Sequence, residues 1–476
     1  MVAKKVWVPV CSLLLLFVAP SSAMGAWTQY LGGPQHTSLS AASVFTAGSI
    51  APRVAWHWTP PAVAGAPRSD LDATPIVSGG RVYMGSRSGV LYALDATTGA
   101  EVWHRVLDTT LALTCPATRG ITATPAFVKD PRNGAWMLYA AGARYLYAIR
   151  PATGAIRWKT RIGPADNPGE NGYYNWSSPT VVAGHIYIGL SSQCDTPLIR
   201  GGVVELNQHT GAVMRTWYSV PPGSIGGSVW SSVAATSDGT RLWVTTGNDC
   251  GPTIDVCPAG NQVGDSLSIV ELSDTFQRLA AWQIPDLTDR NSDFGSSPTL
   301  FGTGTSPTTS SVGACNKNGV YYTFARDPLS VQPLWDAQIG VAADGQGGTG
   351  SCLASAIWNK GSHQLFVAGN QTTIGGVTYG GSIRSVDPTT GSYLWQTGLP
   401  CGTLGTPSEN SANVIAVPTI GACINGQPAV YLIDATSGAI ITSILPGSRT
   451  FAQPVFDGNN LFIATENQGL YALTPS

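Results

Sequence analysis

Charge and histidine are both scarce in this sequence. Only 11% of its 476 residues are charged, the formal net charge at pH 7 is −2, and the 6 histidines are scattered along the chain. The lack of a basic stripe argues against nucleic acid or an acidic membrane surface as a partner. The histidines show no metal-ligand spacing. Because no Cys-x-x-Cys-His motif occurs, the chain is not expected to carry a c-type haem of its own.

Long apolar runs are also absent, apart from one near the start of the chain. Residues 6–18 are apolar, two lysines precede them, and the small residues Ser21-Ser22-Ala23 follow. This pattern is typical of a cleaved secretory signal, and the run is too short for a permanent membrane anchor. We therefore predict a signal peptide at residues 1–23 and a secreted or periplasmic mature chain of residues 24–476.

One of the nine cysteines, Cys11, lies inside this predicted signal, which leaves an even number for an oxidising compartment. The remaining cysteines are Cys115, Cys194, Cys250, Cys257, Cys315, Cys352, Cys401 and Cys423. Cys250 and Cys257 bracket a short loop and form the pair that spacing predicts most directly. Cys401 with Cys423 would lie within one repeat unit, whereas Cys315 with Cys352 and Cys115 with Cys194 would link neighbouring units. These last three pairings stay open, because this many cysteines allow many connectivities.

What the sequence has in abundance is glycine, 56 residues, arranged in a repeated pattern. Each copy reads as a Gly turn, an alternating apolar strand, an Asp-x-x-Thr-Gly turn and then a tryptophan. Clear copies span residues 89–103, 144–158, 202–217 and 382–395, weaker ones span 268–282, 320–335 and 430–444, and a truncated one ends the chain at 469–473. A fixed period of about 50 residues is the mark of a repeat architecture.

One repeat unit contains four short strands. In the first unit they are expected near residues 75–77, 81–85, 90–94 and 101–106, separated by Gly- and Asp-containing turns. Strands this short bury their faces only by stacking against neighbouring units. A four-stranded antiparallel unit of this kind is one blade of a β-propeller.

The number of first strands gives the number of blades. The starts are Pro75, Pro125, Pro179, Ser231, Pro298, Ser355, Pro407 and Pro454. The last unit ends after its third strand, and residues 53–58 (RVAWHW) match the missing outer strand. We therefore predict an all-β, eight-bladed propeller of four-stranded antiparallel blades, a single domain closed by an N-terminal strand. Seven blades with one degenerate insertion is the alternative.

The Ala-x-Asp-x-x-Thr-Gly-x-x-x-Trp repeat resembles the tryptophan-docking repeat of the pyrroloquinoline quinone (PQQ) propellers. That superfamily includes quinoprotein alcohol dehydrogenases, polyvinyl alcohol dehydrogenase and non-catalytic outer-membrane assembly scaffolds. Most tryptophans sit at the outer-strand position of the repeat, where docking between blades accounts for them: Trp58, Trp103, Trp158, Trp217, Trp282, Trp335 and Trp395. Because enzymes and scaffolds share the repeat, the residues that depart from it have to indicate the function.

Trp230 is one such departure. It precedes the first strand of the fourth blade, and Asn248 follows in Thr-Thr-Gly-Asn. The resemblance to the quinoprotein alcohol dehydrogenases implies that the Trp230 indole stacks on PQQ and that Asn248 binds calcium. A core tryptophan and a turn asparagine are the alternative, and Trp176 is a second axial tryptophan that rivals Trp230 for stacking.

Three further residues match the same family by motif. Asp293 lies just before a first strand, like the family's catalytic aspartate, and would accept the alcohol proton. Lys317, in Asn316-Lys-Asn-Gly, corresponds to the residue that contacts the quinone oxygens. Arg119, in an Arg-Gly pair after Cys115, would bind a carboxylate of PQQ. A solvated loop aspartate is the alternative for Asp293.

The blade geometry predicts that these residues meet. First-strand starts and second-to-third turns lie on one face of the disc, so the whole set converges on one mouth of the channel. Two features depart from the family. Cys115 stands where the dehydrogenases have two adjacent cysteines, and Asp195, or Gln193, stands near the position of their calcium-binding glutamate. A calcium site of Asp195, Asn248 and Asp293 remains chemically sound, because hard cations prefer oxygen ligands.

Two functions of different class follow. The first is an exported dehydrogenase dependent on PQQ and Ca²⁺ that oxidises alcohols, with polyvinyl alcohol as one possibility because residues 293–298 and 316–322 resemble that branch most. A separate electron acceptor such as a cytochrome c would then be required. The second is a non-catalytic propeller that holds a protein or glycan partner on its faces.

Overall fold

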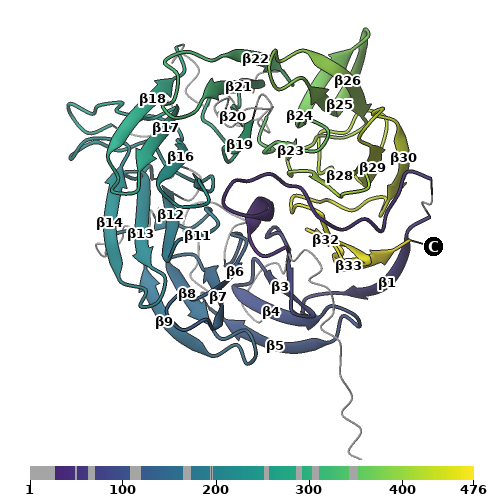
Figure 1. The fold of residues 1–476 in the computed structure, drawn as a ribbon, viewed down its shortest axis with the longest axis horizontal. Helices are drawn as coiled ribbons and strands as arrows, with labels where there is room; N and C mark the ends of the chain where they lie inside the picture. Colours follow the sequence, from purple (N-terminus) through teal and green to yellow (C-terminus); the bar gives the residue numbers. More distant parts are fainter. Residues whose placement is uncertain are drawn as a thin grey trace, which may run out of the picture.

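The computed structural model describes residues 27–48, 51–62, 70–107, 120–164, 173–192, 195, 197–250, 257–285, 292–302, 310–341 and 352–475. Eight antiparallel sheets surround a central axis, like the blades of a propeller (Figure 1). Within the described residues the helical content is one 3₁₀ turn, η1 (Tyr30–Gly32). The prediction of an all-β, eight-bladed propeller is confirmed, and the seven-bladed alternative is wrong.

The strands of each blade follow in sequence from the axis outward. Blade 1 is β2 (Ile76–Ser78), β3 (Arg81–Gly85), β4 (Val90–Asp95) and β5 (Glu101–Val106); blade 2 is β6 (Ala126–Lys129), β7 (Trp136–Ala141), β8 (Tyr145–Ile149) and β9 (Ile156–Arg161). Blade 3 is β11 (Thr180–Val182), β12 (His185–Ser192), β13 (Gly202–Asn207) and β14 (Val213–Tyr218), with β10 (Tyr173–Tyr174) added on β12; blade 4 is β15 (Ala234–Ala235), β16 (Arg241–Thr245), β17 (Ser268–Ser273) and β18 (Arg278–Gln283).

The second half of the ring repeats this order. Blade 5 is β19 (Thr299–Gly302), β20 (Ser310–Cys315), β21 (Val320–Ala325) and β22 (Trp335–Gln338); blade 6 is β23 (Ile357–Asn359), β24 (Gln364–Ile374), β25 (Val377–Val386) and β26 (Tyr393–Leu399). Blade 7 is β27 (Ser408–Glu409), β28 (Val414–Pro418), β29 (Val430–Asp434) and β30 (Ile440–Ile444); blade 8 is β31 (Val455–Asp457), β32 (Asn460–Thr465), β33 (Gly469–Thr474) and, last, β1 (Arg53–Trp58).

The ring closes as predicted from the sequence. β1 pairs antiparallel with β33, from Arg53 opposite Thr474 to Trp58 opposite Leu470. The two ends of the chain therefore share blade 8, and the outer edge of β33 is not left open.

The outer contact between blades is an indole ring on a glycine. Trp103 of blade 1 donates its Nε1–H to the carbonyl oxygen of Pro151 in blade 2 at 2.8 Å. A Cβ added to Gly154 would lie 2.7 Å from the Trp103 ring, and the φ of Gly154 is +68°, so only glycine suits this turn. This contact is the physical reason for the Thr-Gly and Trp positions of the repeat.

The same contact corrects one sequence-based assignment. In β1 the docking tryptophan is Trp56, whose Nε1–H bonds the Ala96 carbonyl oxygen at 3.0 Å and whose ring covers Gly99. Trp58, predicted for this position, packs against Tyr92 instead. Trp56 stands opposite Ala472 of β33 just as Trp103 stands opposite Ala93 of β4, each beside the same kind of register shift, so Trp56 holds the ordinary docking position.

The inner contact between blades is a belt of hydroxyl groups at the start of the first strands. The backbone N–H of Thr74 bonds the Thr124 hydroxyl of the next blade at 3.0 Å, and the N–H of Thr124 bonds that of Ser178 at 2.9 Å. The belt continues through Ser232, Ser297, Ser355 and Thr406, and from Gln453 back to Thr74. Each blade is thus held to its neighbours both near the axis and at the rim.

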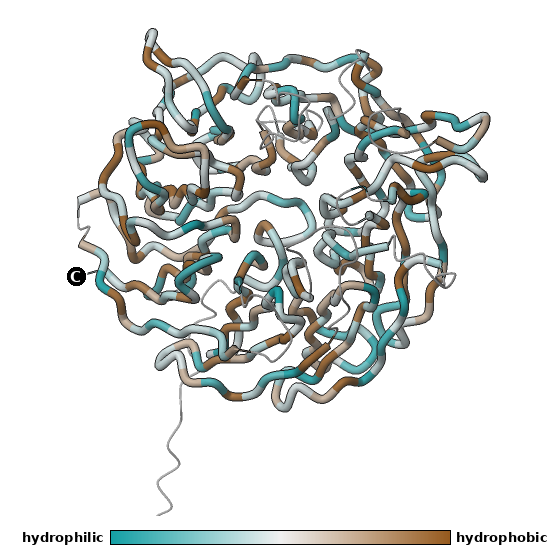
Figure 2. The backbone as a smooth tube through the Cα atoms, turned by 180° about the vertical axis from the view of Figure 1, so that it is seen from behind, coloured by the Kyte–Doolittle hydropathy of each residue, from teal (hydrophilic) through white to brown (hydrophobic). Residues whose placement is uncertain are grey.

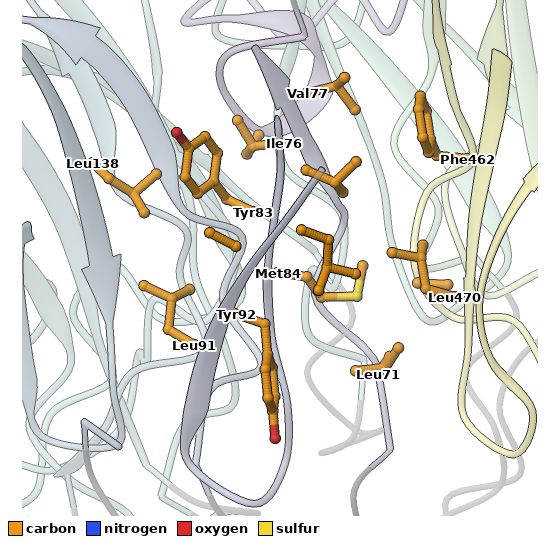
Figure 3. Packing of buried hydrophobic residues seen from close by; sticks show 14 of the residues in the cluster. Leu71, Ile76, Val77, Tyr83, Met84, Leu91, Tyr92, Leu138, Phe462 and Leu470 are labelled. Carbon is orange, nitrogen blue, oxygen red and sulfur yellow. The ribbon is translucent and has the colours of Figure 1, made fainter. Parts of the chain in front are cut away.

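The hydrophobic core consists of layers between neighbouring sheets. Blade 1 contributes Tyr83 and Met84 to a buried cluster that also contains Leu138 of blade 2 and Phe462 of blade 8 (Figure 3). Hydrophobic stretches occur in the sheets all around the ring, between hydrophilic turns (Figure 2). Burial is therefore distributed around the disc.

A segment preceding β1 crosses the centre of the ring (Figure 1). Residues 27–45, here called the axial segment, bond successive blades: the Trp27 carbonyl oxygen accepts from Val77 N–H of blade 1, and the Thr28 carbonyl oxygen accepts from Phe127 N–H of blade 2. Further bonds reach Val181, Ala235, Leu300, Trp358, Glu409 and Phe456. The axial segment thus contacts all eight blades, a role that the sequence did not predict.

Three of the four expected disulfides are present: Cys250–Cys257, Cys315–Cys352 and Cys401–Cys423. The Cys315–Cys352 bond joins blade 5 to the segment that leads into blade 6. Cys115 and Cys194 lie outside the described residues. No helix among the described residues is long and apolar enough to cross a membrane.

The docking contact predicts a large and position-specific stability loss. Trp103→Ala should lower the free energy of unfolding by about 3 kcal/mol, because it removes a large packed ring and a hydrogen bond between two blades. Trp136→Ala, which removes an indole that is 46% exposed, should cost about 1 kcal/mol. Urea denaturation measures both, and equal losses would contradict the docking role.

Buried Glu409 predicts a pH dependence of stability. Its Oε1 accepts from Asn359 Nδ2 at 2.8 Å, its backbone bonds the axial segment, and burial raises the pKa of its carboxyl to about 7. The folded state then holds a proton that the unfolded state releases near pH 4.5, so this residue's contribution to stability falls as pH rises from about 4.5 to about 7. Glu409→Gln should flatten that part of the pH–stability curve. Parallel curves for variant and wild type would refute the assignment.

Candidate functional site

A cavity of about 380 Å³ lies at the axis, at the starts of the first strands. The axial segment bonds the same strands a few residues further along and contributes Tyr30 to the cavity wall. All eight blades contribute lining residues: Asp72 and Arg87, Thr122 and Thr124, Trp176 and Asp195, Ser228 and Trp230, Asp293 and Lys317, Leu353, Leu404 and Thr406, and Gln453 and Glu466. Five of the residues singled out from the sequence are among them.

Asp293 is the centre of a three-residue cluster in this cavity. Its Oδ2 accepts a hydrogen bond from Trp230 Nε1 at 2.8 Å, and its Oδ1 lies 2.5 Å from the Lys317 Nζ. The ammonium also sits 5.5 Å from the centre of the Trp230 ring. The Asp293 side chain is 3% exposed, so this carboxylate depends on the indole and the ammonium to offset its loss of solvent.

Neighbouring turns hold the cluster in place. The backbone N–H of Lys317 bonds the Asp293 carbonyl oxygen at 3.1 Å, and Asn316 Nδ2 bonds the Ser292 carbonyl oxygen at 2.7 Å. A Cβ on Gly295 would lie 2.7 Å from the Trp230 ring. The loop before β19 and the β20–β21 turn are therefore fixed to each other, with the indole lying close against Gly295.

Asp195 and Asn248 form a second pair beside the first. Asn248 Nδ2 donates to Asp195 Oδ2 at 2.9 Å, and the Ser192 hydroxyl donates to Asp195 Oδ1 at 2.9 Å. Burial and the nearby charge of Asp293 raise the pKa of the Asp195 carboxyl. The Asn248 Oδ1 atom is buried and has no hydrogen-bond partner among the described residues. Two carboxylates and one unsatisfied amide oxygen thus lie in one small region.

Trp176, the rival stacking residue, also lines the cavity. Its Nε1–H bonds the Ser192 carbonyl oxygen at 3.0 Å, and its ring packs against Tyr174 at 4.9 Å between centroids. The structure therefore brings together Trp176, Trp230, Asp195, Asn248, Asp293 and Lys317. Arg119 and Gln193 lie outside the described residues, so their predicted roles stay predictions.

The sequence analysis missed the opposite wall. Arg87 of blade 1 pairs there with Asp72, and Glu466 of blade 8 lies 3.8 Å from the guanidinium. The sequence did contain a signal for Arg87, because Ser86-Arg-Ser-Gly and Asn316-Lys-Asn-Gly occupy the same turn of two repeat units. The belt hydroxyls had a similar signal in the Ser or Thr that precedes most first-strand prolines.

No group of three or more His, Cys, Asp or Glu side chains suited to a metal occurs among the described residues. Asp195, Asn248 and Asp293 are not such a group, because they contain only two carboxylates and their third oxygen donor is an amide. Chemically, the cavity offers a buried carboxylate able to accept a proton, an adjacent cation, an aromatic surface and hard oxygen ligands.

Comparison with known proteins identifies the family to which this chain belongs. Residues 27–267, just over half of the chain, match the family model "Glucose/ethanol/alcohol dehydrogenase, beta-propeller domain". The chain belongs to this family. Residues 379–476 match a second model, that of the outer membrane protein assembly factor BamB. The first match includes Asp195, Trp230 and Asn248, whereas Asp293 and Lys317 lie outside both.

The individual proteins that match this chain share little sequence identity with it. A polyvinylalcohol dehydrogenase from a Pseudomonas species is 27% identical over 200 residues, which are 36% of this chain and 29% of that protein. The match therefore spans under a third of that relative's length.

Among solved structures, a europium-containing methanol dehydrogenase has a TM-score of 0.72 at 16% identity, covering 93% of this chain and 89% of its own. The quinohemoprotein alcohol dehydrogenase of Comamonas testosteroni also gives 0.72 at 16%, covering 94% and 80%. BamB of Moraxella catarrhalis gives 0.54 at 12%, covering 90% and 99%. At these identities the likeness concerns the fold.

The Asp293–Lys317 pair predicts a characteristic double-mutant result. Lys317→Met should lower the free energy of unfolding by about 3 kcal/mol, because it leaves a buried carboxylate without its cation. Adding Asp293→Asn to that variant should recover much of the loss, since no charge is then unpaired and the amide oxygen can still accept from Trp230.

Chemical denaturation of the two singles and the double variant measures this coupling. Lys360→Met, which removes an exposed lysine at the end of β23, is the matched control and should change stability little. Additive effects of the two site changes would contradict the proposed pairing.

Proposed function

We propose that this protein is an exported alcohol dehydrogenase that depends on PQQ and Ca²⁺. The observation that carries the proposal is the meeting of Trp230, Asp293 and Lys317 in one axial cavity, with Asp195 and Asn248 beside them. A scaffold has no chemical need for a buried acid, a cation and an indole that converge on one cavity.

The residues present fit the two groups. A flat quinone can stack on the Trp230 indole, which lines the cavity beside the Lys317 ammonium. A calcium ion would satisfy the buried Asn248 Oδ1 atom and would draw on the carboxylates of Asp195 and Asp293, the oxygen ligands that this ion prefers. Arg119 is proposed to contact a carboxylate of PQQ.

Asp293 is proposed as the catalytic base. PQQ, when bound, would supply the oxidising chemistry as the acceptor of the two electrons and the hydrogen that leave the alcohol carbon, which becomes a carbonyl. The Asp293 carboxylate would take the hydroxyl proton of the substrate, and the Trp230 N–H bond fixes the direction of its Oδ2 atom. The Lys317 ammonium lies 2.5 Å from the Asp293 Oδ1 atom and would face the quinone oxygens.

The electrons must then leave the protein. Since the sequence has no Cys-x-x-Cys-His motif, we propose a separate acceptor such as a cytochrome c. Export would place the protein in the periplasm or outside the cell, and its three observed disulfides are typical of an oxidising compartment. Removal of residues 1–23 as a signal peptide belongs to the same proposal, which leaves residues 24–476 as one domain.

The BamB match favours a second candidate, a non-catalytic propeller that binds a protein or glycan on its faces. That match covers residues 379–476, in blades 6 to 8, whereas the proposed active-site residues belong to blades 3 to 5. The family-model match therefore concerns the part of the ring without the acid, the indole and the lysine, while the likeness in fold extends over 90% of the chain. We favour the enzyme for this reason.

A binding experiment on the cofactor-free protein tests the proposal. PQQ with Ca²⁺ should quench tryptophan fluorescence and raise the melting temperature, because a ligand that binds only the folded state stabilises it, by about 2.7 kcal/mol at 100 times its Kd. Trp230→Ala should abolish the quench, while Trp136→Ala, at an exposed position on β7, should retain it. Asp293→Asn should keep PQQ binding and lose dye-linked alcohol oxidation. An intact fold with no melting shift at saturating PQQ and Ca²⁺ would support the scaffold instead.

A further inference from the structure

The acid–cation pair of blade 5 has a counterpart in blade 1. Asp70 and Asp293 stand at the same distance before their first strands, and Arg87 and Lys317 hold the same position in the second-to-third turns. The backbone agrees, because Arg87 N–H bonds the Asp70 carbonyl oxygen at 2.9 Å and Lys317 N–H bonds the Asp293 carbonyl oxygen at 3.1 Å. Both cations line the same cavity.

The two pairs lie on opposite walls. Blades 1 and 5 are four positions apart in a ring of eight. In the described parts of blades 2, 3, 4, 7 and 8 the position of the acid is held by Gly120, Tyr174, Ser228, Gly402 and Arg449. Among the blades whose residue at this position is described, only these two opposite ones carry an acid there.

The blade 1 wall carries more negative charge than its counterpart. Its guanidinium contacts three carboxylates, those of Asp70 at 3.7 Å, Asp72 and Glu466 at 3.8 Å. The only one of these carboxylates that Arg449 contacts among the described residues is Glu466, with 3.0 Å between Arg449 Nε and Glu466 Oε2. Arg87 is therefore already neutralised and has little attraction left for an anion.

Asp72 has an unused acceptor on this wall. It lines the cavity, its side chain is 4% exposed, and its Oδ2 binds Arg87, but its Oδ1 has no hydrogen-bond partner among the described residues. A buried carboxylate oxygen without a donor is costly, and a hydroxyl group from a ligand would satisfy it. The Thr122 and Thr124 hydroxyls extend the polar surface beside it.

We propose that the blade 1 wall, with Asp72 as its acceptor, binds a second hydroxyl group of the substrate, so that diols and polyols are preferred over monohydric alcohols. This inference rests on the proposed dehydrogenase function. Asp293 would act on the reacting hydroxyl at one wall, while Asp72 would receive a distant hydroxyl of the same molecule at the other. Asp72 is thus a specificity-determining residue and takes no part in proton transfer.

The test compares matched alcohols with the protein loaded with PQQ and Ca²⁺, at pH 8. The dye-linked kcat/KM is measured for α,ω-diols of three to six carbons and for primary alcohols of the same lengths. In the wild type at least one diol should exceed its matched alcohol by about 10-fold or more, as expected for a hydrogen bond to a charged group. Asp72→Asn should bring that ratio close to one by lowering kcat/KM far more for the diols than for the monohydric alcohols.

A melting experiment provides a second readout. The preferred diol should raise the melting temperature of the loaded wild type but not of Asp72→Asn, whereas PQQ with Ca²⁺ should raise the melting temperature of both. Asp457→Asn removes a half-buried carboxyl outside the cavity lining and should retain the diol preference. The wild-type ratio decides the case even where Asp72→Asn fails to fold.

The outcomes distinguish a failure of this inference from a failure of the proposed dehydrogenase function. A wild type that oxidises alcohols without preferring any diol overturns this inference and leaves the dehydrogenase standing. A wild type that binds no PQQ and oxidises no alcohol removes the proposed function itself. A loss of PQQ binding in Asp72→Asn, with an unchanged diol ratio, would assign Asp72 to the cofactor and also overturn the inference.

Discussion

The whole architecture depends on how one blade contacts the next, and that contact is an indole packed on a backbone that has no Cβ. Trp103 lies on Gly154, and a side chain of any size at that glycine would collide with the ring. Because the N–H of the same indole bonds the turn that contains the glycine, position and angle are set together. Repeated around the disc and matched by the inner hydroxyl belt, this contact allows strands that are mostly six residues or shorter to form one stable domain.

The candidate site lies in the blades whose outer contact departs from the pairing of an indole with a glycine. In blade 4 the glycine of the turn is replaced by Phe276, which adopts a φ of +61° and packs beside Trp217, and Trp282 of the same blade contacts Tyr322 and Phe324. Blades 4 and 5 therefore use bulkier contacts than their neighbours. They also supply most of the proposed active site. In a repeat protein the shared positions determine the fold, so chemistry has to come from positions that the repeat does not constrain.

The sequence predicted the number of blades and closure by β1, which periodicity controls, and the Cys250–Cys257 disulfide, which its short loop indicates. It misplaced the docking residue of β1, because RVAWHW contains two tryptophans two residues apart, and the one opposite Ala472 is Trp56. It also missed the axial segment, because residues 27–45 do not repeat and their bonds are mainly backbone bonds, which carry no residue-type signal. Arg87 was missed for a different reason, since its turn is visible only when two units are compared.

Charge in the cavity links the proposed calcium to the proposed cofactor. The described lining holds four carboxylates, of Asp72, Asp195, Asp293 and Glu466, but only two cations, Arg87 and Lys317. A tricarboxylate such as PQQ would add to this negative excess beside carboxylates that are themselves largely buried, where like charges repel strongly. A divalent cation held by Asp195 and Asp293 would offset that repulsion at the wall where Trp230 would offer its stacking surface. On the proposed function, calcium is therefore an electrostatic requirement for cofactor binding as well as a participant in the chemistry.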